Sequence, residues 1–315
     1  MENVLMSAFE NLISGNPDEL KAYLLEVASK QKIEETQSEL HIHMLRLDGN
    51  NRPRINDLAV FLAYCIIDYC IPKKDIAEAT EKDSKYRTKQ YTSQLYRKAE
   101  SLFTDLKNTG EGGELLLSIM MQRILGIPQL LCKMPLKTNS DVHYHGADGL
   151  YGNYDAAAQK FCLYWGESKI YSDLDQALSN CFDSIKGLLV EEGATGTQRT
   201  RDLELFRDNI DFDNEELEKA VLQYLNPESE FYLHLEYRGA CLIGYDEEAY
   251  PNDMSKLESE IFNEINSKIS VFKSKINSRL KNRTPLDKFK MHIFIVPFSS
   301  VEAFRNKLLG ELKCL

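Results

Sequence analysis

Strand and helix patterns alternate along this chain from residue 112 to the C-terminus. A helix pattern is followed by three strand patterns and a helix, then by an acidic segment, a strand, a helix, a strand and a final helix. The run FKMHIFIVPF (289–298) is apolar and rich in β-branched residues, which is typical of a strand buried on both faces. Because interleaved strands and helices pack as layers, we predict an α/β fold with a mixed central sheet flanked by helices.

The first 107 residues have mainly helical patterns. These patterns cover residues 3–29, 55–70 and 73–107, and the first is interrupted at Asn16-Pro17. The stretch SELHIHMLRL alternates apolar and polar residues and then meets the turn signal DGNN, so it predicts a strand. We therefore expect a mostly helical N-terminal region with one strand over residues 1–107, followed by an α/β core over residues 108–315.

The predicted core also contains two long elements and one insertion. Residues 230–246 predict one bent strand or a hairpin around Arg238-Gly239, and residues 253–281 predict a single long helix. Residues 191–228 predict an acidic helical insertion, which begins with the flexible stretch EEGATGTQRT.

Charge is distributed unevenly along the chain, whose net charge is −11. Residues 191–264 hold 20 acidic and 6 basic residues, whereas residues 268–290 hold 8 basic residues and one acidic residue. The overall negative charge disfavours unaided binding to nucleic acid. The acidic segment is suited to dock on a basic partner or to shield a site. The basic, tyrosine-containing run 85–98 is suited to clamp nucleic acid, although both basic segments are equally typical of solvated helix faces.

Several protein classes are disfavoured by composition. No segment approaches the roughly 20 apolar residues of a membrane span, so we expect no membrane association. The acidic N-terminus lacks the basic start of a signal peptide. The seven cysteines are scattered and form no CxxC pair, which is typical of reduced thiols in a cytoplasmic protein.

Three residues with suitable chemistry lie near one another in the predicted sheet. Asp148 lies between Gly146 and Gly149, and Glu167 and Lys169 follow on the strand pattern 160–171. The i, i+2 spacing of Glu167 and Lys169 places both side chains on the same face of a strand. If this strand pairs beside the Asp148 segment, two carboxylates and an ammonium group face one cleft.

A hard divalent cation prefers such oxygen ligands. We predict a Mg²⁺ site, with Mn²⁺ as a substitute, whose ligands are Asp148, Glu167, the backbone carbonyl of Ser168, and Glu114 in the first turn of the preceding helix. Glu111 is the alternative to Glu114. The metal ion would activate water for attack on a phosphodiester, and Lys169 would orient that water or neutralise the phosphate.

Each of these residues also has an ordinary structural interpretation. Asp148 is typical of an Asx turn, and Glu167 with Lys169 is typical of an ion pair on an exposed strand face. Glu114 is typical of a first-turn carboxylate that complements a helix dipole. The sequence pattern alone leaves these alternatives open.

The arrangement of Asp148 before Glu167-Ser168-Lys169, with Glu114 on a preceding helix, resembles the PD-(D/E)xK nuclease superfamily. The order of helix, three strands, helix and strand also fits the core of that superfamily. Ala147 stands where the superfamily name has proline, at a position that the superfamily keeps loosely.

A closer resemblance involves the motifs GEGGELLLSIMMQRILGIPQLLCKMPLK, VHYHGADGLYG and CLYWGESKIYSDLDQA. These motifs resemble the nuclease subunit of the Hachiman anti-phage defence system, over roughly residues 40–300. The resemblance implies a metal-dependent DNA nuclease that works with a large ATP-driven helicase, which restrains it until aberrant DNA is sensed. The alternative is a non-catalytic regulatory or DNA-end-binding subunit of the same kind of complex. The sequence does not distinguish DNA from RNA as the substrate.

Two histidine pairs have the i, i+2 spacing of metal ligands, namely His41 with His43 and His143 with His145. Neither pair is accompanied by a cysteine or a third histidine in the local sequence, so we predict locally hydrogen-bonded histidines and no zinc site. Lys133 and Lys137 flank a short strand pattern, where they would either contact phosphate or lie on a solvated face.

Overall fold

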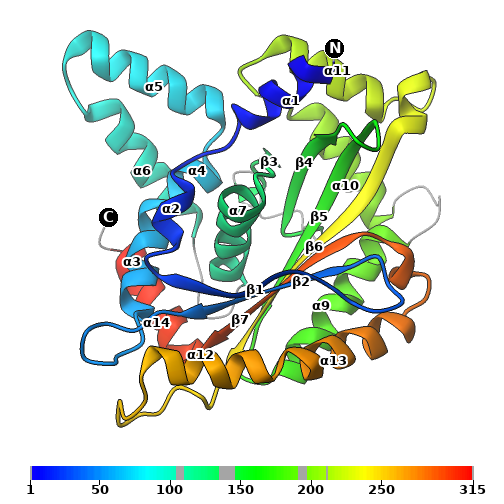
Figure 1. Cartoon of the computed structure of the whole chain (residues 1–315). Helices are drawn as coiled ribbons and strands as arrows, with labels where there is room; N and C mark the ends of the chain where they lie inside the picture. Colours follow the sequence, from blue (N-terminus) through cyan, green and yellow to red (C-terminus); the bar gives the residue numbers. More distant parts are fainter. Residues whose placement is uncertain (1, 104–109, 135–145, 191–196, 211, 314–315) are drawn as a thin grey trace.

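A single seven-stranded sheet runs through the protein (Figure 1). The computed structural model describes residues 2–103, 110–134, 146–190, 197–210 and 212–313. The strand order is β1-β2-β7-β6-β5-β4-β3. The strands are β1 (Leu24–Lys32), β2 (Glu39–Leu45), β3 (Gln129–Leu131), β4 (Gly149–Asp155), β5 (Lys160–Ile170), β6 (Leu235–Asp246) and β7 (Met291–Phe298).

The sheet is mixed, as predicted. Strands β2, β7, β6 and β5 are parallel neighbours, while β1, β4 and β3 join by antiparallel pairing. The predicted central strand is confirmed as β7, in which Ile293, Phe294, Ile295 and Val296 are all inaccessible to solvent. An internal parallel strand is covered on both faces, which explains its continuous apolar run.

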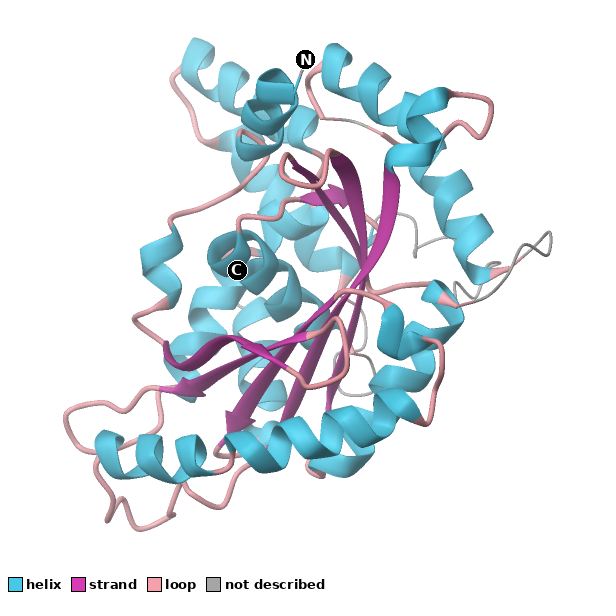
Figure 2. Ribbon diagram, turned by 45° about the vertical axis from the view of Figure 1, so that its right-hand side comes forward, coloured by secondary structure: helices cyan, strands magenta, loops and turns pink. Residues whose placement is uncertain are grey.

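Helices cover both faces of the twisted sheet (Figure 2). The α-helices are α1 (Glu2–Glu10), α2 (Pro17–Leu20), α3 (Ile55–Tyr64), α4 (Ile66–Cys70), α5 (Lys73–Tyr86), α6 (Gln90–Leu102), α7 (Glu111–Leu125), α9 (Leu174–Leu189), α10 (Gln198–Asp208), α11 (Glu215–Leu225), α12 (Glu258–Ser267), α13 (Ile269–Lys281) and α14 (Val301–Leu312). Two short 3-10 helices, η1 (Glu230–His234) and η2 (Leu286–Lys288), complete the described elements.

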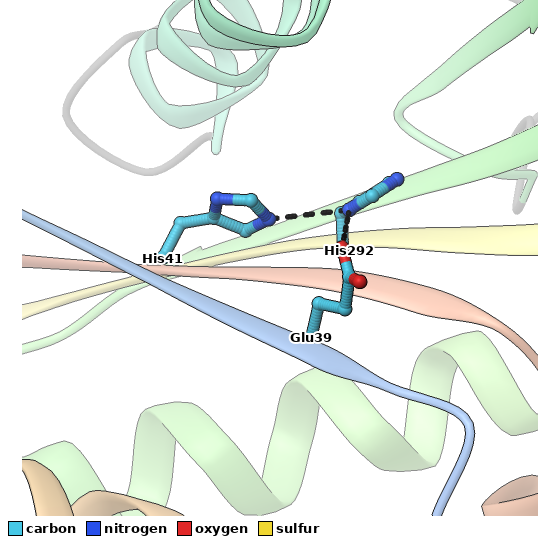
Figure 3. Close-up of side chains that lie close together, drawn as sticks. All are labelled: Glu39, His41 and His292. Atoms are coloured by element: carbon cyan, nitrogen blue, oxygen red, sulfur yellow. Dashed lines mark hydrogen bonds and ion pairs between the residues drawn. The ribbon is translucent and has the colours of Figure 1, made fainter. Parts of the chain in front are cut away.

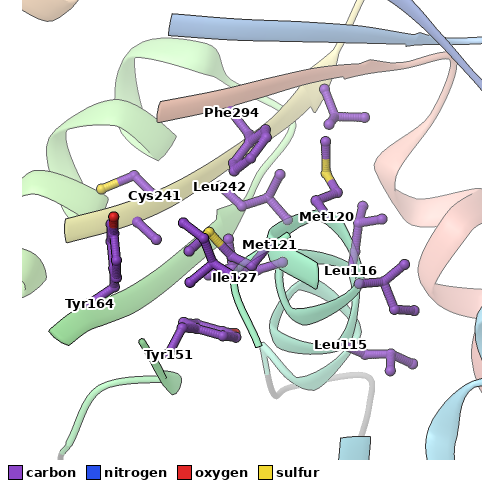
Figure 4. Close-up of a cluster of buried hydrophobic side chains, with 14 of the residues drawn as sticks. Leu115, Leu116, Met120, Met121, Ile127, Tyr151, Tyr164, Cys241, Leu242 and Phe294 are labelled. Carbon is purple, nitrogen blue, oxygen red and sulfur yellow. The ribbon is translucent and has the colours of Figure 1, made fainter. Parts of the chain in front are cut away.

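The buried helix α7 packs on β5 and β6. Its Met120 and Met121 meet Leu242 of β6 and Phe294 of β7 in the core between helix and sheet (Figure 4). All four side chains are fully buried. On β5, Ser168 faces α7, whereas Glu167 contacts Ser184 of α9 on the other face. The alternation of a strand therefore sends neighbouring residues of β5 into different layers.

The predicted helix over residues 3–29 is wrong in its last part, because residues 24–29 belong to strand β1. This strand pairs with β2 in an antiparallel hairpin, and its exposure alternates along LLEVASKQK. The N-terminal region thus supplies two strands to the same sheet, where one was predicted. Pairing with a neighbouring strand overrides the local helical preference of Leu, Glu and Ala. The domain boundary at residue 107 stays a prediction.

The structure corrects the prediction for residues 253–281 and decides between the two alternatives for residues 230–246. The single helix predicted over 253–281 is two helices, α12 and α13, which meet at Lys268. Residues 235–246 form one continuous strand, so the hairpin alternative at Arg238-Gly239 is wrong. Strand β6 lies between β5 and β7 and pairs with both, which requires an extended segment of this length. Residues 191–228 include the helices α10 and α11, whereas their status as an insertion into the core stays a prediction.

Candidate functional site

The predicted site residues converge on one cavity of about 290 Å³. Glu114 comes from α7, Asp148 immediately precedes β4, and Glu167 and Lys169 come from β5. The complete lining is Glu114, Lys133, Gly146, Ala147, Asp148, Glu167, Lys169, Ser184, Leu188 and Gln198. Four segments that are separated in sequence therefore bring three carboxylates and two ammonium groups to one cavity.

Asp148 is tied to strand β5 by both its backbone and its side chain. Its N–H group donates to the Gly166 carbonyl at 2.9 Å. Its Oδ2 atom accepts hydrogen bonds from the backbone N–H of Ser168 at 2.7 Å and from the Ser168 hydroxyl at 2.8 Å. The backbone hydrogen bond continues the β4–β5 pairing to Asp148, and the two side-chain hydrogen bonds orient its carboxylate. Ser168 itself does not line the cavity, so its carbonyl as a metal ligand stays a prediction.

Glu167 and Lys169 lie on the same face of β5, as their spacing predicts, and they form an ion pair. The Glu167 side chain is almost completely buried. Burial raises the pKa of Glu167 to about 8, the charge of Asp148 acts in the same direction, and Lys169 opposes the shift. For Lys169, burial lowers the pKa, but the charges of Glu167 and Asp148 outweigh burial and raise the pKa above its usual value. The interpretation of these two residues as a solvent-exposed ion pair is wrong.

Glu114 lies in the first turn of α7 and is buried. Its Oε2 atom accepts a hydrogen bond from the hydroxyl of Tyr69 in α4 at 2.9 Å. Glu111 is also buried but does not line the cavity, so the structure brings Glu114, and not its alternative, to the predicted cluster.

The three carboxylates do not all close around one point in this conformation. Within the described part of the chain, one group of three potential metal-binding atoms lies within 4.8 Å of one another, and it is formed by Glu39, His41 and His292. Glu114, Asp148 and Glu167 therefore share a cavity without forming a compact triad. The Lys169 ammonium group donates a hydrogen bond to Glu167 Oε1. It thus occupies the position that a metal cation would take beside this carboxylate.

Sequence reasoning did not find the buried pair that closes the cavity wall. Lys133 Nζ lies 2.8 Å from Asp202 Oδ2 and donates to the Ala147 carbonyl at 2.8 Å. Asp202 Oδ2 also accepts from the Ala147 N–H at 2.9 Å. The solvated-face interpretation of Lys133 is wrong, because its side chain is only 4% exposed. No local pattern pointed to Asp202, which lies on α10 inside the acidic insertion.

The close contact between Asp202 and the segment before β4 also requires a glycine at position 146. A Cβ atom on Gly146 would overlap Asp202 Oδ1. Gly146 therefore lets helix α10 approach the segment that carries Asp148. The acidic insertion lines the cavity through Gln198, and Asp202 lies behind the lining residues Lys133 and Ala147, which it contacts.

The basic segment 268–283 uses much of its charge within the protein. Lys275 and Arg279 both lie 2.6 Å from carboxylate oxygens of Asp175 in α9. Arg283 lies 2.7 Å from Asp183 in the same helix. These ion pairs attach α13 to α9, so they favour the interpretation of this segment as a packed helix rather than a nucleic-acid surface.

The histidine predictions have mixed outcomes. His41 has local neighbours, because its Nδ1 atom lies 3.4 Å from both Ser29 Oγ and the Lys30 backbone nitrogen. Its Nε2 atom, however, lies 3.2 Å from Nδ1 of His292, which is distant in sequence (Figure 3). Burial lowers the pKa of His41 to about 4 and that of His292 to about 3, so both imidazoles are neutral at pH 7. His143, His145 and Lys137 lie outside the described residues.

The fold and the cavity define an α/β protein whose mixed sheet presents acidic and lysine side chains from a strand, an adjoining turn and a helix. Residues 21–312 match the family model HamA. The chain belongs to the HamA family and is thereby a subunit of the Hachiman defence system. The comparison with curated proteins returned no match. None of the helices in the described ranges combines the length and apolarity needed to cross a membrane.

Proposed function

We propose that this subunit is a metal-dependent DNA nuclease that acts as the effector of a defence complex with a helicase partner. The observation that carries this proposal is the convergence of Glu114, Asp148, Glu167 and Lys169 on one cavity. Carboxylate oxygens beside a lysine are a suitable set for a hard cation and a phosphate group.

The residues present fit Mg²⁺ in their chemistry. Asp148 and Glu167 would hold the ion, and Glu114 would hold it directly or through a water molecule. Bound Mg²⁺ would polarise the phosphate and promote ionisation of a water molecule. Lys169, which remains cationic beside two carboxylates, would neutralise charge on the phosphate once it moves from Glu167. Ser168 keeps Asp148 oriented through two hydrogen bonds to one carboxylate oxygen.

A helicase partner is consistent with the charge distribution. A protein of net charge −11 gains little from unaided encounter with DNA, so delivery by a partner favours the reaction. The insertion borders the cavity at Gln198 of α10. The acidic excess of residues 191–264 as a whole disfavours the approach of a polyanion. We therefore expect the intact complex to cut DNA poorly until it is activated.

The decisive experiment measures degradation of plasmid DNA by the activated complex with and without Mg²⁺. Glu167→Gln and Lys169→Ala should each abolish cutting, while the matched exposed variants Glu248→Gln and Lys219→Ala should keep wild-type activity. Unchanged cutting by either cavity variant contradicts the assignment of that residue. Cutting that persists in excess EDTA contradicts the metal dependence, and parallel assays on RNA identify the substrate class.

A second candidate function is a regulatory or DNA-end-binding subunit without catalysis. It is favoured by one observation, namely that Glu114, Asp148 and Glu167 form no compact triad while Lys169 is paired with Glu167. This alternative predicts that the complex binds DNA ends in Mg²⁺ or Mn²⁺ without cutting them. It also predicts that Glu167→Gln leaves protection against phage unchanged.

A further inference from the structure

A second cluster of potential metal ligands lies where the N-terminal hairpin joins the sheet. Glu39 and His41 come from β2, and His292 comes from the parallel neighbour β7. Glu39 is directly paired with His292 in the strand register, and His41 lies two residues further along β2. This register places the three side chains together on one face of the sheet (Figure 3).

Two of the three distances between the ligand atoms are close to those of a metal site. His41 Nε2 lies 3.2 Å from His292 Nδ1, and Glu39 Oε2 lies 3.6 Å from the same nitrogen. All three atoms lie within 4.8 Å of one another. In a tetrahedral zinc site with bonds of about 2.0–2.1 Å, neighbouring ligand atoms are about 3.3 Å apart. The cluster therefore needs little rearrangement to surround an ion.

We propose that Glu39, His41 and His292 bind a divalent transition metal of the Zn²⁺ class. Two imidazoles and one carboxylate suit this class better than Mg²⁺, which prefers oxygen ligands. Glu39 and His292 line a cavity of about 470 Å³, which provides room for a water molecule as a fourth ligand. The site is separate from the carboxylate and lysine cavity and does not depend on nuclease activity.

The surroundings orient the two imidazoles. His41 stacks on Phe294 with 4.8 Å between ring centroids, and His292 stacks on Tyr164 at 5.9 Å. In this structure Nδ1 of His41 accepts from the Lys30 backbone N–H at 3.4 Å. Binding of the ion at Nε2 would move the ring proton to Nδ1, which would give up that long hydrogen bond and donate to Ser29 Oγ, also 3.4 Å away. Such an outer hydrogen bond fixes the tautomer and the orientation of a histidine ligand.

Nearby cationic side chains disfavour the binding of a metal cation at this site, whereas nearby carboxylates favour it. The cations Lys30 and Arg238 lie close enough to affect the histidines. Arg238 is compensated by Asp155 at 2.9 Å and by Glu236, and the carboxylate of Glu39 contributes one negative charge to the ion itself. The side chains of His292 and Glu39 are 19% and 31% exposed, which provides an entry path.

Metal binding here would fasten the β1–β2 hairpin to the centre of the sheet. His41 and His292 are separated by 251 residues, so the ion would join the two ends of the sequence. Because the ligand set forms only in the folded chain, Zn²⁺ should stabilise the native state.

The test uses the full chain, stripped of metal by a chelator. Calorimetric titration with Zn²⁺ should show one site with Kd of about 1 µM or tighter, and Tm should rise by about 4 °C at 100 times Kd. Co²⁺ should give tetrahedral absorption bands without thiolate charge transfer. His292→Asn and Glu39→Gln should weaken binding at least tenfold and remove the rise in Tm.

Two matched variants separate this site from its neighbours. His43→Gln alters a buried histidine on the same strand, and Glu167→Gln alters the carboxylate and lysine cavity, so both should retain Zn²⁺ binding. Equal affinity in wild type and Glu39→Gln, or thiolate bands with Co²⁺, overturns the proposal. Long-range ¹H–¹⁵N spectra of the wild type provide a test without mutation. A His41 ring that keeps its proton on Nε2 at saturating Zn²⁺ also overturns it.

Discussion

Lys133 Nζ and Asp202 Oδ2 are 2.8 Å apart in the wall of the candidate site, with side chains 4% and 0% exposed. This pair joins the segment after β3 to helix α10 of the acidic insertion, 69 residues further along the chain. The same carboxylate oxygen receives the Ala147 N–H, one residue before Asp148. The position of the candidate metal ligand therefore depends on a contact with the insertion.

Breaking this pair should destabilise the protein strongly. Asp202→Ala removes the carboxylate that compensates the buried charge of Lys133, and we expect the free energy of unfolding to fall by about 3–5 kcal/mol. Urea denaturation measures the change. The double variant Lys133→Met/Asp202→Leu should lose less than the sum of the single variants, whereas the exposed Glu215→Ala should change little. If the free energy of unfolding lost by the double variant equals the sum of the losses of the two single variants, Lys133 and Asp202 do not interact specifically.

Substitution of Gly146 should disturb the site through the same contact. In Gly146→Ala the new methyl group overlaps Asp202, so we expect a loss of about 1–3 kcal/mol in the free energy of unfolding and reduced cutting by the activated complex. Gly310→Ala is the matched control, because its new methyl group meets no atom within 4 Å and the residue lies within α14. A fully stable and active Gly146→Ala protein would show that the close approach is unimportant.

Glu247 should make the fold sensitive to acid. Burial raises its pKa, but hydrogen bonds from Lys268, Tyr245 and the Ala249 N–H outweigh burial, so the pKa is lowered from its usual value of 4.5. A carboxyl group whose pKa is lowered in the folded state contributes stability above its unfolded pKa and loses that contribution as pH falls.

Stability that depends on Glu247 is thus expected to be present at pH 6 and to disappear progressively below about pH 4.5. Urea denaturation of wild type and Glu247→Gln at pH 6, 5, 4 and 3.5 tests this expectation. The difference between the two proteins should shrink as pH decreases. A constant difference would show that the Glu247 charge is not involved.

The basic helices should contribute differently to DNA binding. Lys89 and Arg97 lie exposed in the α5–α6 region, whereas Lys275 and Arg279 are paired with Asp175. We expect Lys89→Glu/Arg97→Glu to weaken DNA binding by the complex and to reduce the dependence of log Kd on log salt concentration by about 1 for each phosphate that is no longer neutralised. Lys275→Ala should leave this dependence unchanged. The opposite result would identify α13 as the DNA surface.

Local sequence patterns predicted the parts of the site whose geometry is local. The i, i+2 spacing in β5 requires Glu167 and Lys169 to share a face, and the turn before β4 places Asp148 beside the same strand. The apolar run of β7 likewise predicted a central strand, because such a run is tolerated only where both faces are covered. The role of these residues in catalysis stays a prediction.

The sequence by itself determined the mixed α/β architecture and the family to which the chain belongs, since both depend on the order of elements and on local motifs. Only the tertiary structure decided that residues 24–32 form a strand, that Asp202 pairs with Lys133, and that His292 meets His41. The physical reason is the same for all three. Each depends on a partner in another segment, and periodicity within one segment carries no information about that partner. For residues 24–32 the partner is the neighbouring strand β2, and for Lys133 and His41 it lies 69 and 251 residues away.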